Sequence, residues 1–213
     1  MKTDDFIAML ANDAEVIHPR FASRRFPVAL GLGIAGAAIL MLLLLHARTD
    51  LAQAVWMPLF WTKAGFVAVV AGISLMATIR LSRPGQAPLW SVRLLVIPVA
   101  AMWAAGAIVL WNAETGERIA LFLGSTWKVC PFLIAMLSTP VFVGVIWTMR
   151  GLAPTRHRQA GFFAGLLSGA TAALVYCVHC PEMQLPFIGF WYVLGMLIPA
   201  MIGTALGPRL LRW

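Results

Sequence analysis

Three cysteines, two of them followed by proline, lie at the ends of two apolar segments, where their thiols could do chemistry. Cys130 lies in the sequence Trp-Lys-Val-Cys-Pro, and Cys177 and Cys180 lie in Cys-Val-His-Cys-Pro-Glu, which also supplies His179 and Glu182. Paired cysteines can form a disulfide, and thiolates beside an imidazole are good ligands for soft metals. A carboxylate can add an oxygen ligand. These five residues are therefore the first candidates for a reactive site.

Three interpretations of the cysteines compete. A single cysteine in an apolar segment is most often a packing residue. Clustered cysteines would instead suit a disulfide or metal sensor, because the space outside a bacterial inner membrane is oxidising. Alternatively, Cys177 and Cys180 form the C-x-x-C motif of thiol–disulfide oxidoreductases, but no second pair is present to relay electrons. We favour Cys130 with Cys180 as the functional pair and Cys177 as a structural residue.

The first 26 residues contain a second candidate element, a short acidic amphipathic helix over about 3–18. Thr3 is a suitable N-cap, and the sequence His18-Pro19 ends the pattern. The apolar residues recur at i, i+3, i+4, i+8 and i+11, which is one stripe of a helix. The stripe consists of Phe6, Met9, Leu10, Ala14 and Ile17, and the acidic residues are Asp4, Asp5, Asp13 and Glu15.

This helix has three interpretations. It could lie among lipid headgroups, but helices of that kind are usually basic because cytoplasmic lipids are anionic. It could be disordered, since a helix of about 15 residues is marginal alone in water. We favour a helix that becomes ordered in the hydrophobic groove of a basic protein partner.

The composition of the whole chain indicates the class of protein to which these elements belong. Of the 213 residues, 61% are hydrophobic and 11% are charged, and the mean hydropathy is +0.86. Soluble domains are about 25% charged. The chain therefore has too little polar surface for a water-soluble globule, and we expect an all-α polytopic membrane protein.

Six apolar segments approach the roughly 20 residues needed to span a bilayer. The fold expected is a six-helix transmembrane bundle that follows the cytoplasmic segment 1–26 and occupies 27–213. The expected spans are 27–45, 62–79, 92–111, 129–149, 160–178 and 186–207.

The charges of the loops predict the orientation. Only four of the 16 basic residues fall on one side, namely Arg48, Lys63, Arg118 and Lys128. Because cytoplasmic loops collect Lys and Arg, both termini are expected in the cytoplasm and the cysteines outside it. The same rule explains the net charge of +8, which in a soluble protein would indicate nucleic-acid binding.

The uninterrupted apolar runs inside these spans, such as 64–79 and 94–111, contain no Asp, Glu, Lys, Arg or His. Ion and proton transporters need such groups within the membrane. Function is therefore expected at the two faces. Glycines at helical spacing in the last two spans predict close helix packing, either within the chain or at a homodimer face. They are Gly161, Gly165 and Gly169, followed by Gly195, Gly203 and Gly207.

Taken together, these features resemble the NrsF family of anti-sigma factors, the negative regulators of sigma factor F. The resemblance rests on the opening Met-Lys-Thr-Asp-Asp, the six spans, Cys130-Pro131 and Cys180-Pro181-Glu182, and it covers essentially the whole chain. Cys177 is an addition to that pattern.

The resemblance implies an inner-membrane protein that sequesters an extracytoplasmic-function (ECF) sigma factor on its cytoplasmic side. It further implies that Cys130 and Cys180 sense heavy-metal or oxidative stress, for which His179 and Glu182 could act as helpers. The residues expected to contact the sigma factor are Asp4, Asp5, Phe6, Met9, Leu10, Asp13 and Ile17.

No enzymatic activity, direct nucleic-acid contact or obligatory cofactor is expected. A heavy-metal ion held transiently by the cysteines is the only candidate ligand. The expected partners are the sigma factor, the lipid bilayer and, if the glycines form a dimer face, a second copy of the chain.

Overall fold

A computed structural model describes residues 20–85, 89–152 and 154–212 of the chain. The expected N-terminal helix over about 3–18 lies outside the described residues. Within the described part, every regular element is a helix and none is a strand. The all-α fold class predicted from the sequence is therefore confirmed.

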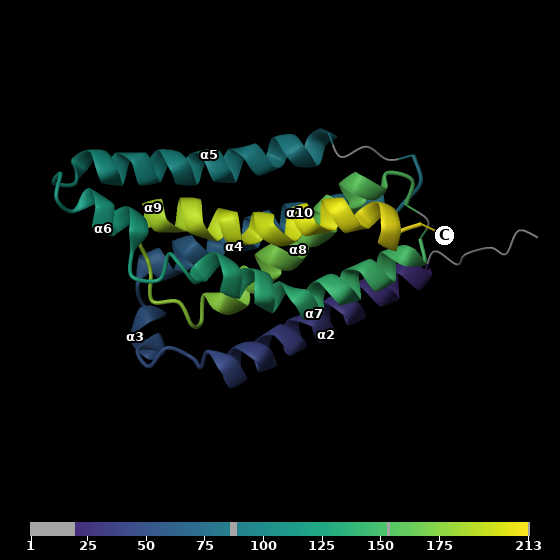
Figure 1. The fold of residues 1–213 in the computed structure, drawn as a ribbon, viewed down its shortest axis with the longest axis horizontal. Coiled ribbons are helices and arrows are strands. Elements are labelled where there is room, and N and C mark those ends of the chain that lie inside the picture. Colours follow the sequence, from purple (N-terminus) through teal and green to yellow (C-terminus); the bar gives the residue numbers. More distant parts are fainter. Residues whose placement is uncertain (1–19, 86–88, 153, 213) are drawn as a thin grey trace, which may run out of the picture.

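Six helices are long and apolar enough to cross a membrane, and they run along the long axis of the molecule (Figure 1). The last of them is continuous through a short α-helix, a π-helical turn and a longer α-helix. The six are α2 (Arg20–Leu44), α4 (Pro58–Leu81), α5 (Leu89–Asn112), α7 (Cys130–Arg150), α8 (His157–Tyr176) and α9–η1–α10 (Leu185–Phe187, Ile188–Tyr192, Val193–Leu210). Two short helices, α3 (Leu51–Ala54) and α6 (Arg118–Leu123), lie in connections.

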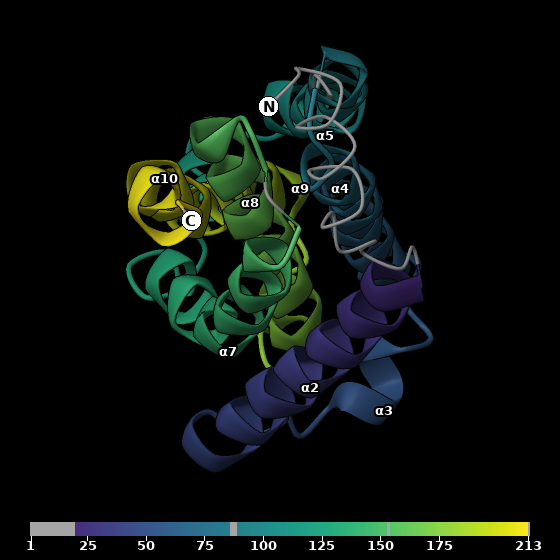
Figure 2. The ribbon, with the colours of Figure 1, turned by 90° about the vertical axis from the view of Figure 1, so that its right-hand side faces the viewer.

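Helix α8 occupies the centre of the bundle. It is the most buried of the six long helices, and it packs against α10, α4 and α7. Helix α5 is the least buried and lies at the periphery next to α4 and α9, as the end-on view shows (Figure 2). Both ends of the described chain, Arg20 and Arg212, lie at the same end of the bundle (Figure 1).

Glycines bring the backbones of α8 and α10 into direct contact. A Cβ atom added to Gly161 would collide with the carbonyl oxygen of Gly203, and one added to Gly203 would collide with the carbonyl oxygen of Gly161. Gly165 faces Pro199 in the same way. Small residues permit this close approach, which favours helix association in lipid. These glycines therefore form helix contacts within the chain, which is the first of the two kinds of packing that their spacing predicted.

Five prolines lie within the long helices without ending them at that point. They are Pro27 in α2, Pro98 in α5, Pro140 in α7, and Pro199 and Pro208 in α10. Such prolines are tolerated in membrane bundles where neighbouring groups satisfy the freed carbonyls.

Candidate functional site

The structure brings the three cysteines together at the cysteine end of the bundle, defined here as the end where α7 begins and α8 terminates. Cys130 is the first residue of α7, and Cys177 and Cys180 follow the last residue of α8. All three are free thiols and buried. The Cys130 and Cys180 thiols lie within hydrogen-bonding reach of each other. The pair favoured from the sequence is therefore adjacent, although 50 residues of chain separate its members.

Local backbone bonds place the two thiols at the same depth. Helix α7 begins at Cys130 because Pro131 occupies a first-turn position, where its missing N–H costs no hydrogen bond. The Cys130 N–H donates to the carbonyl of Thr126 at 2.9 Å. After α8 ends, the Cys180 N–H donates to the carbonyl of Tyr176, also at 2.9 Å. Each cysteine is thus held by the turn that begins or ends its helix.

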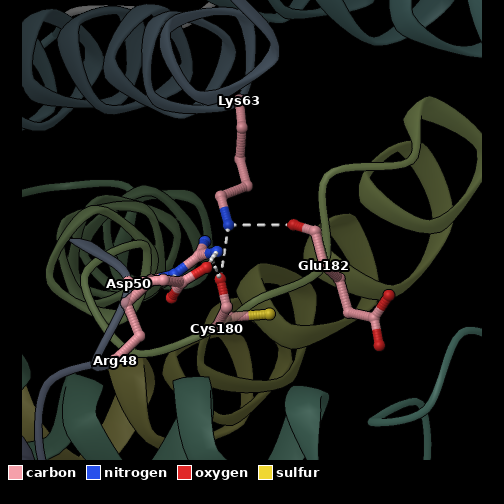
Figure 3. A network of polar contacts seen from close by, with 5 residues as sticks. All are labelled: Arg48, Asp50, Lys63, Cys180 and Glu182. Carbon is pink, nitrogen blue, oxygen red and sulfur yellow. Dashed lines mark hydrogen bonds and ion pairs between the residues drawn. The ribbon is translucent and has the colours of Figure 1, made fainter. Parts of the chain in front are cut away.

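Lys63 lies at the cysteine end, in the second turn of α4, which begins at Pro58. Its side chain is 0% exposed, a burial that the sequence did not predict. Its Nζ donates to the carbonyl oxygen of Cys180 at 2.9 Å and to that of Glu182 at 3.0 Å. These two bonds satisfy an ammonium that burial would otherwise make very costly. Figure 3 shows this side chain reaching from α4 to the segment 180–182.

The buried ammonium has no carboxylate partner among the residues that the structure describes. The only ion pair there joins Arg48 to Asp50. Arg48 also donates to the Cys180 carbonyl at 3.5 Å, so two cations approach the backbone of this cysteine (Figure 3). The hydrogen bond from Arg48 lowers the pKa of Asp50 below its usual value, and the pKa of Arg48 is raised. The Cys180 carbonyl therefore accepts from two cationic side chains, Lys63 and Arg48.

The surroundings of Cys180 and Cys177 differ. The hydrogen bond with the Cys130 thiol, together with the charge of Lys63, lowers the pKa of Cys180 to about 6. Burial raises the pKa of Cys177 to about 11. Because the thiolate is the reactive form, the difference in pKa favours reaction at Cys180 over reaction at Cys177.

A π-helical turn at Ile188–Tyr192 closes the other side of the cluster. Such turns are rare and are frequent at functional sites. The ring of Tyr192 lies 5.5 Å from Lys63 Nζ. The Tyr192 side chain is buried, and its hydroxyl interacts with the thiols of Cys180 and Cys177.

The two expected helper residues make other contacts in this conformation. The His179 ring bonds through Nδ1 to the carbonyl of His46 at 2.8 Å. The Glu182 carboxylate accepts hydrogen bonds from the backbone N–H and the hydroxyl of Ser125 at 2.7 and 2.6 Å. Glu182 instead serves the cluster through its backbone, whose N–H interacts with Cys180 and whose carbonyl binds Lys63. Their role as side-chain helpers stays a prediction.

A metal centre with three protein ligands does not form in the described conformation. No group of three or more His, Cys, Asp and Glu side chains comes close enough to hold a metal ion among the described residues. The two adjacent thiols of Cys130 and Cys180 could still bind a soft metal as a two-ligand site.

The expected sigma-factor contacts form the second candidate site. All of them lie outside the described residues, so their arrangement stays a prediction. They are Asp4, Asp5, Phe6, Met9, Leu10, Asp13 and Ile17.

Comparison with known proteins gives two full-length relatives and a family match. The family model described as NrsF, negative regulator of sigma F, matches residues 10–213. The chain is 56% identical over 213 residues to the "Probable anti-sigma-F factor NrsF" of Azospira oryzae and 38% identical over 216 residues to the "Anti-sigma-F factor NrsF" of Caulobacter vibrioides. Each alignment covers 100% of both chains. No solved structure matches the chain.

Proposed function

The chain belongs to the NrsF family of negative regulators of sigma F, and on this premise we propose how it works. It sequesters an ECF sigma factor at the bacterial inner membrane and releases it when Cys130 and Cys180 react with a thiophilic metal or an oxidant. Both termini lie in the cytoplasm and the cysteines face the periplasm. The family is a regulatory one, which agrees with a protein that catalyses no reaction of its own.

The acidic N-terminal segment is the proposed sigma-binding element. Sigma factors bind DNA and therefore carry basic surfaces, which Asp4, Asp5 and Asp13 would meet. Complementary charge speeds encounter between partners, and the apolar stripe of Phe6, Met9, Leu10 and Ile17 would hold the complex. Helix α2, which follows this segment in the sequence, begins at the end of the bundle opposite the cysteines (Figure 1).

The observation that carries the sensing proposal is the adjacency of two buried thiols contributed by different helices. A disulfide between Cys130 and Cys180 would covalently tie the start of α7 to the segment after α8. A soft metal bound by both sulfurs would tie the same two points. Oxidation to the disulfide would remove the negative charge of the Cys180 thiolate, and a bound metal ion would add positive charge to it. Either product therefore changes the charge balance around the buried Lys63.

Lys63 connects the segment that carries Cys180 to helix α4. Its ammonium bonds two carbonyls of the segment 180–182, and its helix α4 packs on α8 and runs to the opposite end of the bundle. Modification of Cys180 would shift that segment and with it the position of α4. Allosteric couplings of roughly 1–3 kcal/mol change an affinity about 5–150-fold, which is enough for release.

The alternative function, a thiol–disulfide oxidoreductase using Cys177 and Cys180, has weaker support. An attacking cysteine needs a thiolate, and burial raises the pKa of Cys177 to about 11. The thiol that hydrogen-bonds with Cys180 belongs to Cys130, not to Cys177, which is the other cysteine of the C-x-x-C motif.

Co-purification tests the proposed function. The full-length protein is extracted in mild detergent from its own host, beside a variant that lacks residues 2–20. We expect a sigma factor to accompany the full-length protein and not the variant. Equal recovery with both would place the binding element elsewhere. Recovery with neither, combined with turnover of the cysteines by a thiol substrate, would favour the oxidoreductase.

A further inference from the structure

Three arginines converge on one cavity at the end of the bundle opposite the cysteines. Arg158 comes from the first turn of α8, Arg209 from the last turn of α10, and Arg212 from the residues that follow. The cavity has a volume of about 430 Å³. Besides the arginines it is lined by Met201, Thr204, Ala205 and Pro208. All three arginines are exposed, so their guanidinium groups are available to a ligand.

These charges have no counter-charge in the part of the chain that the structure describes. The only ion pair there, Arg48–Asp50, is at the cysteine end. The remaining described carboxylates, Glu114, Glu117 and Glu182, belong to that end as well. A fourth arginine, Arg150, donates to the carbonyl of Leu210 and so holds the end of α10 in place. The arginine cavity is therefore a positively charged site without a counter-charge among the described residues.

The walls of the cavity show what kind of anion would fit. Thr204 uses its hydroxyl within α10, where it donates to the carbonyl of Ala200 at 2.9 Å. The other lining residues, Met201, Ala205 and Pro208, are apolar. Met201 lies more than two turns before the end of α10, is 61% exposed, and is followed by the exposed Ile202. An apolar surface thus leads from the arginines along α10 toward the middle of the bundle.

We propose that the arginine cavity binds an anionic phospholipid, with its headgroup phosphate on Arg158, Arg209 and Arg212 and an acyl chain along Met201 and Ile202. Guanidinium groups bind phosphate oxygens with paired hydrogen bonds. Basic pockets between transmembrane helices on the cytoplasmic side are suited to such headgroups. A small inorganic anion would use the charges but leave the apolar wall without a partner. The proposal requires that the helices cross a bilayer, and it does not depend on the sigma-factor proposal.

The bound lipid would brace the central helix α8 against its neighbour α10. Arg158 and Arg209 belong to α8 and α10, whose backbones already touch through Gly161 and Gly203. The lipid would stabilise this end of the α8–α10 pair, while the other end carries the cysteines.

Lipid retention measured by native mass spectrometry tests the proposal on the full-length protein. The protein is reconstituted in a mixture of phosphatidylglycerol and phosphatidylcholine with matched acyl chains, and bound lipid is counted after mild detergent extraction. We expect selective retention of phosphatidylglycerol. Arg209→Gln with Arg212→Gln should weaken that binding about 30-fold, the loss expected when two arginines near an anionic surface are neutralised.

A matched double variant, Arg83→Gln with Arg93→Gln, removes the same charge from exposed arginines outside the cavity. It should retain phosphatidylglycerol as the unmodified protein does. Equal retention of the two lipids by the unmodified protein, or an equal loss in both double variants, would overturn the proposal, because general surface charge would then explain the binding.

Two further measurements distinguish the lipid from other occupants of the cavity. Glycerophosphoglycerol, which has the headgroup without acyl chains, should not displace the lipid; if it competes equally well, the site is one for free phosphate compounds. Deletion of residues 2–20 should leave retention unchanged. If the deletion is required before phosphatidylglycerol binds, the acidic N-terminal segment occupies the cavity and the lipid proposal is wrong.

Discussion

The Nζ atom of Lys63 donates a 2.9 Å hydrogen bond to the carbonyl oxygen of Cys180, 117 residues further along the chain. Both residues are 0% exposed. The bond joins the early part of α4 to the segment that carries the most reactive of the three thiols. The ammonium of this buried lysine bonds two backbone carbonyls, and its positive charge lowers the pKa of the Cys180 thiol. The chemistry of this cysteine and the position of α4 are therefore linked.

Lys63→Met should destabilise the protein by about 1–3 kcal/mol, since it leaves two buried carbonyls without their donor. Thermal unfolding in detergent would measure this as a lower Tm. The matched control is Lys128→Met, because Lys128 is exposed and its ammonium lies 5.5 Å from the Trp127 ring. A similar Tm for the two variants would show that the buried bonds contribute nothing.

The pH dependence of Cys180 follows from its lowered pKa. Its thiolate should form as pH rises through about 6, well below the ordinary value of 9.0. The thiolate's favourable contacts therefore contribute fully to stability above about pH 9, and the contribution is lost as pH falls through about 6. Ultraviolet absorbance of the thiolate would follow the titration.

The titration has two informative variants. Cys177→Ser should leave the midpoint unchanged, whereas Lys63→Met should move it toward 9 because the nearby positive charge is gone. If the titration midpoint were the same in Lys63→Met as in the unmodified protein, Lys63 would have no electrostatic role at this thiol.

Cys130→Ser with Cys180→Ser should leave sigma-factor binding intact and abolish release by thiol-reactive stress, because no disulfide or two-sulfur metal site can form. A reporter gene driven by the sigma factor would measure both states. Cys177→Ser is the control and should respond like the unmodified protein. A normal response in the double variant would refute the thiol mechanism.

Gly203→Ala should destabilise the bundle by about 1–3 kcal/mol, the usual range for overpacking, because its Cβ would collide with the Gly161 carbonyl. Gly72→Ala is the control. No atom lies within 4 Å of a Cβ at Gly72 in α4, and alanine is the better helix former. Thermal unfolding compares the two. If both variants were equally stable, the α8–α10 contact would be looser than described.

Local patterns were sufficient for the helices and for the favoured cysteine pair. A run of about 20 apolar residues can satisfy its backbone in lipid only as a helix, so composition and length predicted six of them. The alternation of the spans placed Cys130 and Cys180 at the same face. The prolines within helices and the glycines at helical spacing were also recognisable from the sequence, because each pattern lies within a few helical turns.

The role of Lys63 depended on tertiary structure. Next to an apolar run, a lysine normally extends its ammonium into water, and no local signal distinguishes this one. Its partners are backbone carbonyls of residues 180 and 182, which every residue possesses and which only packing of α4 against the segment after α8 brings within reach. The sequence by itself therefore determined the spans and the depth of the cysteines. Tertiary structure decided which buried charge lies near Cys180. A hydrogen bond to a backbone carbonyl can involve any residue type, so the sequence at positions 180 and 182 gives no sign of it.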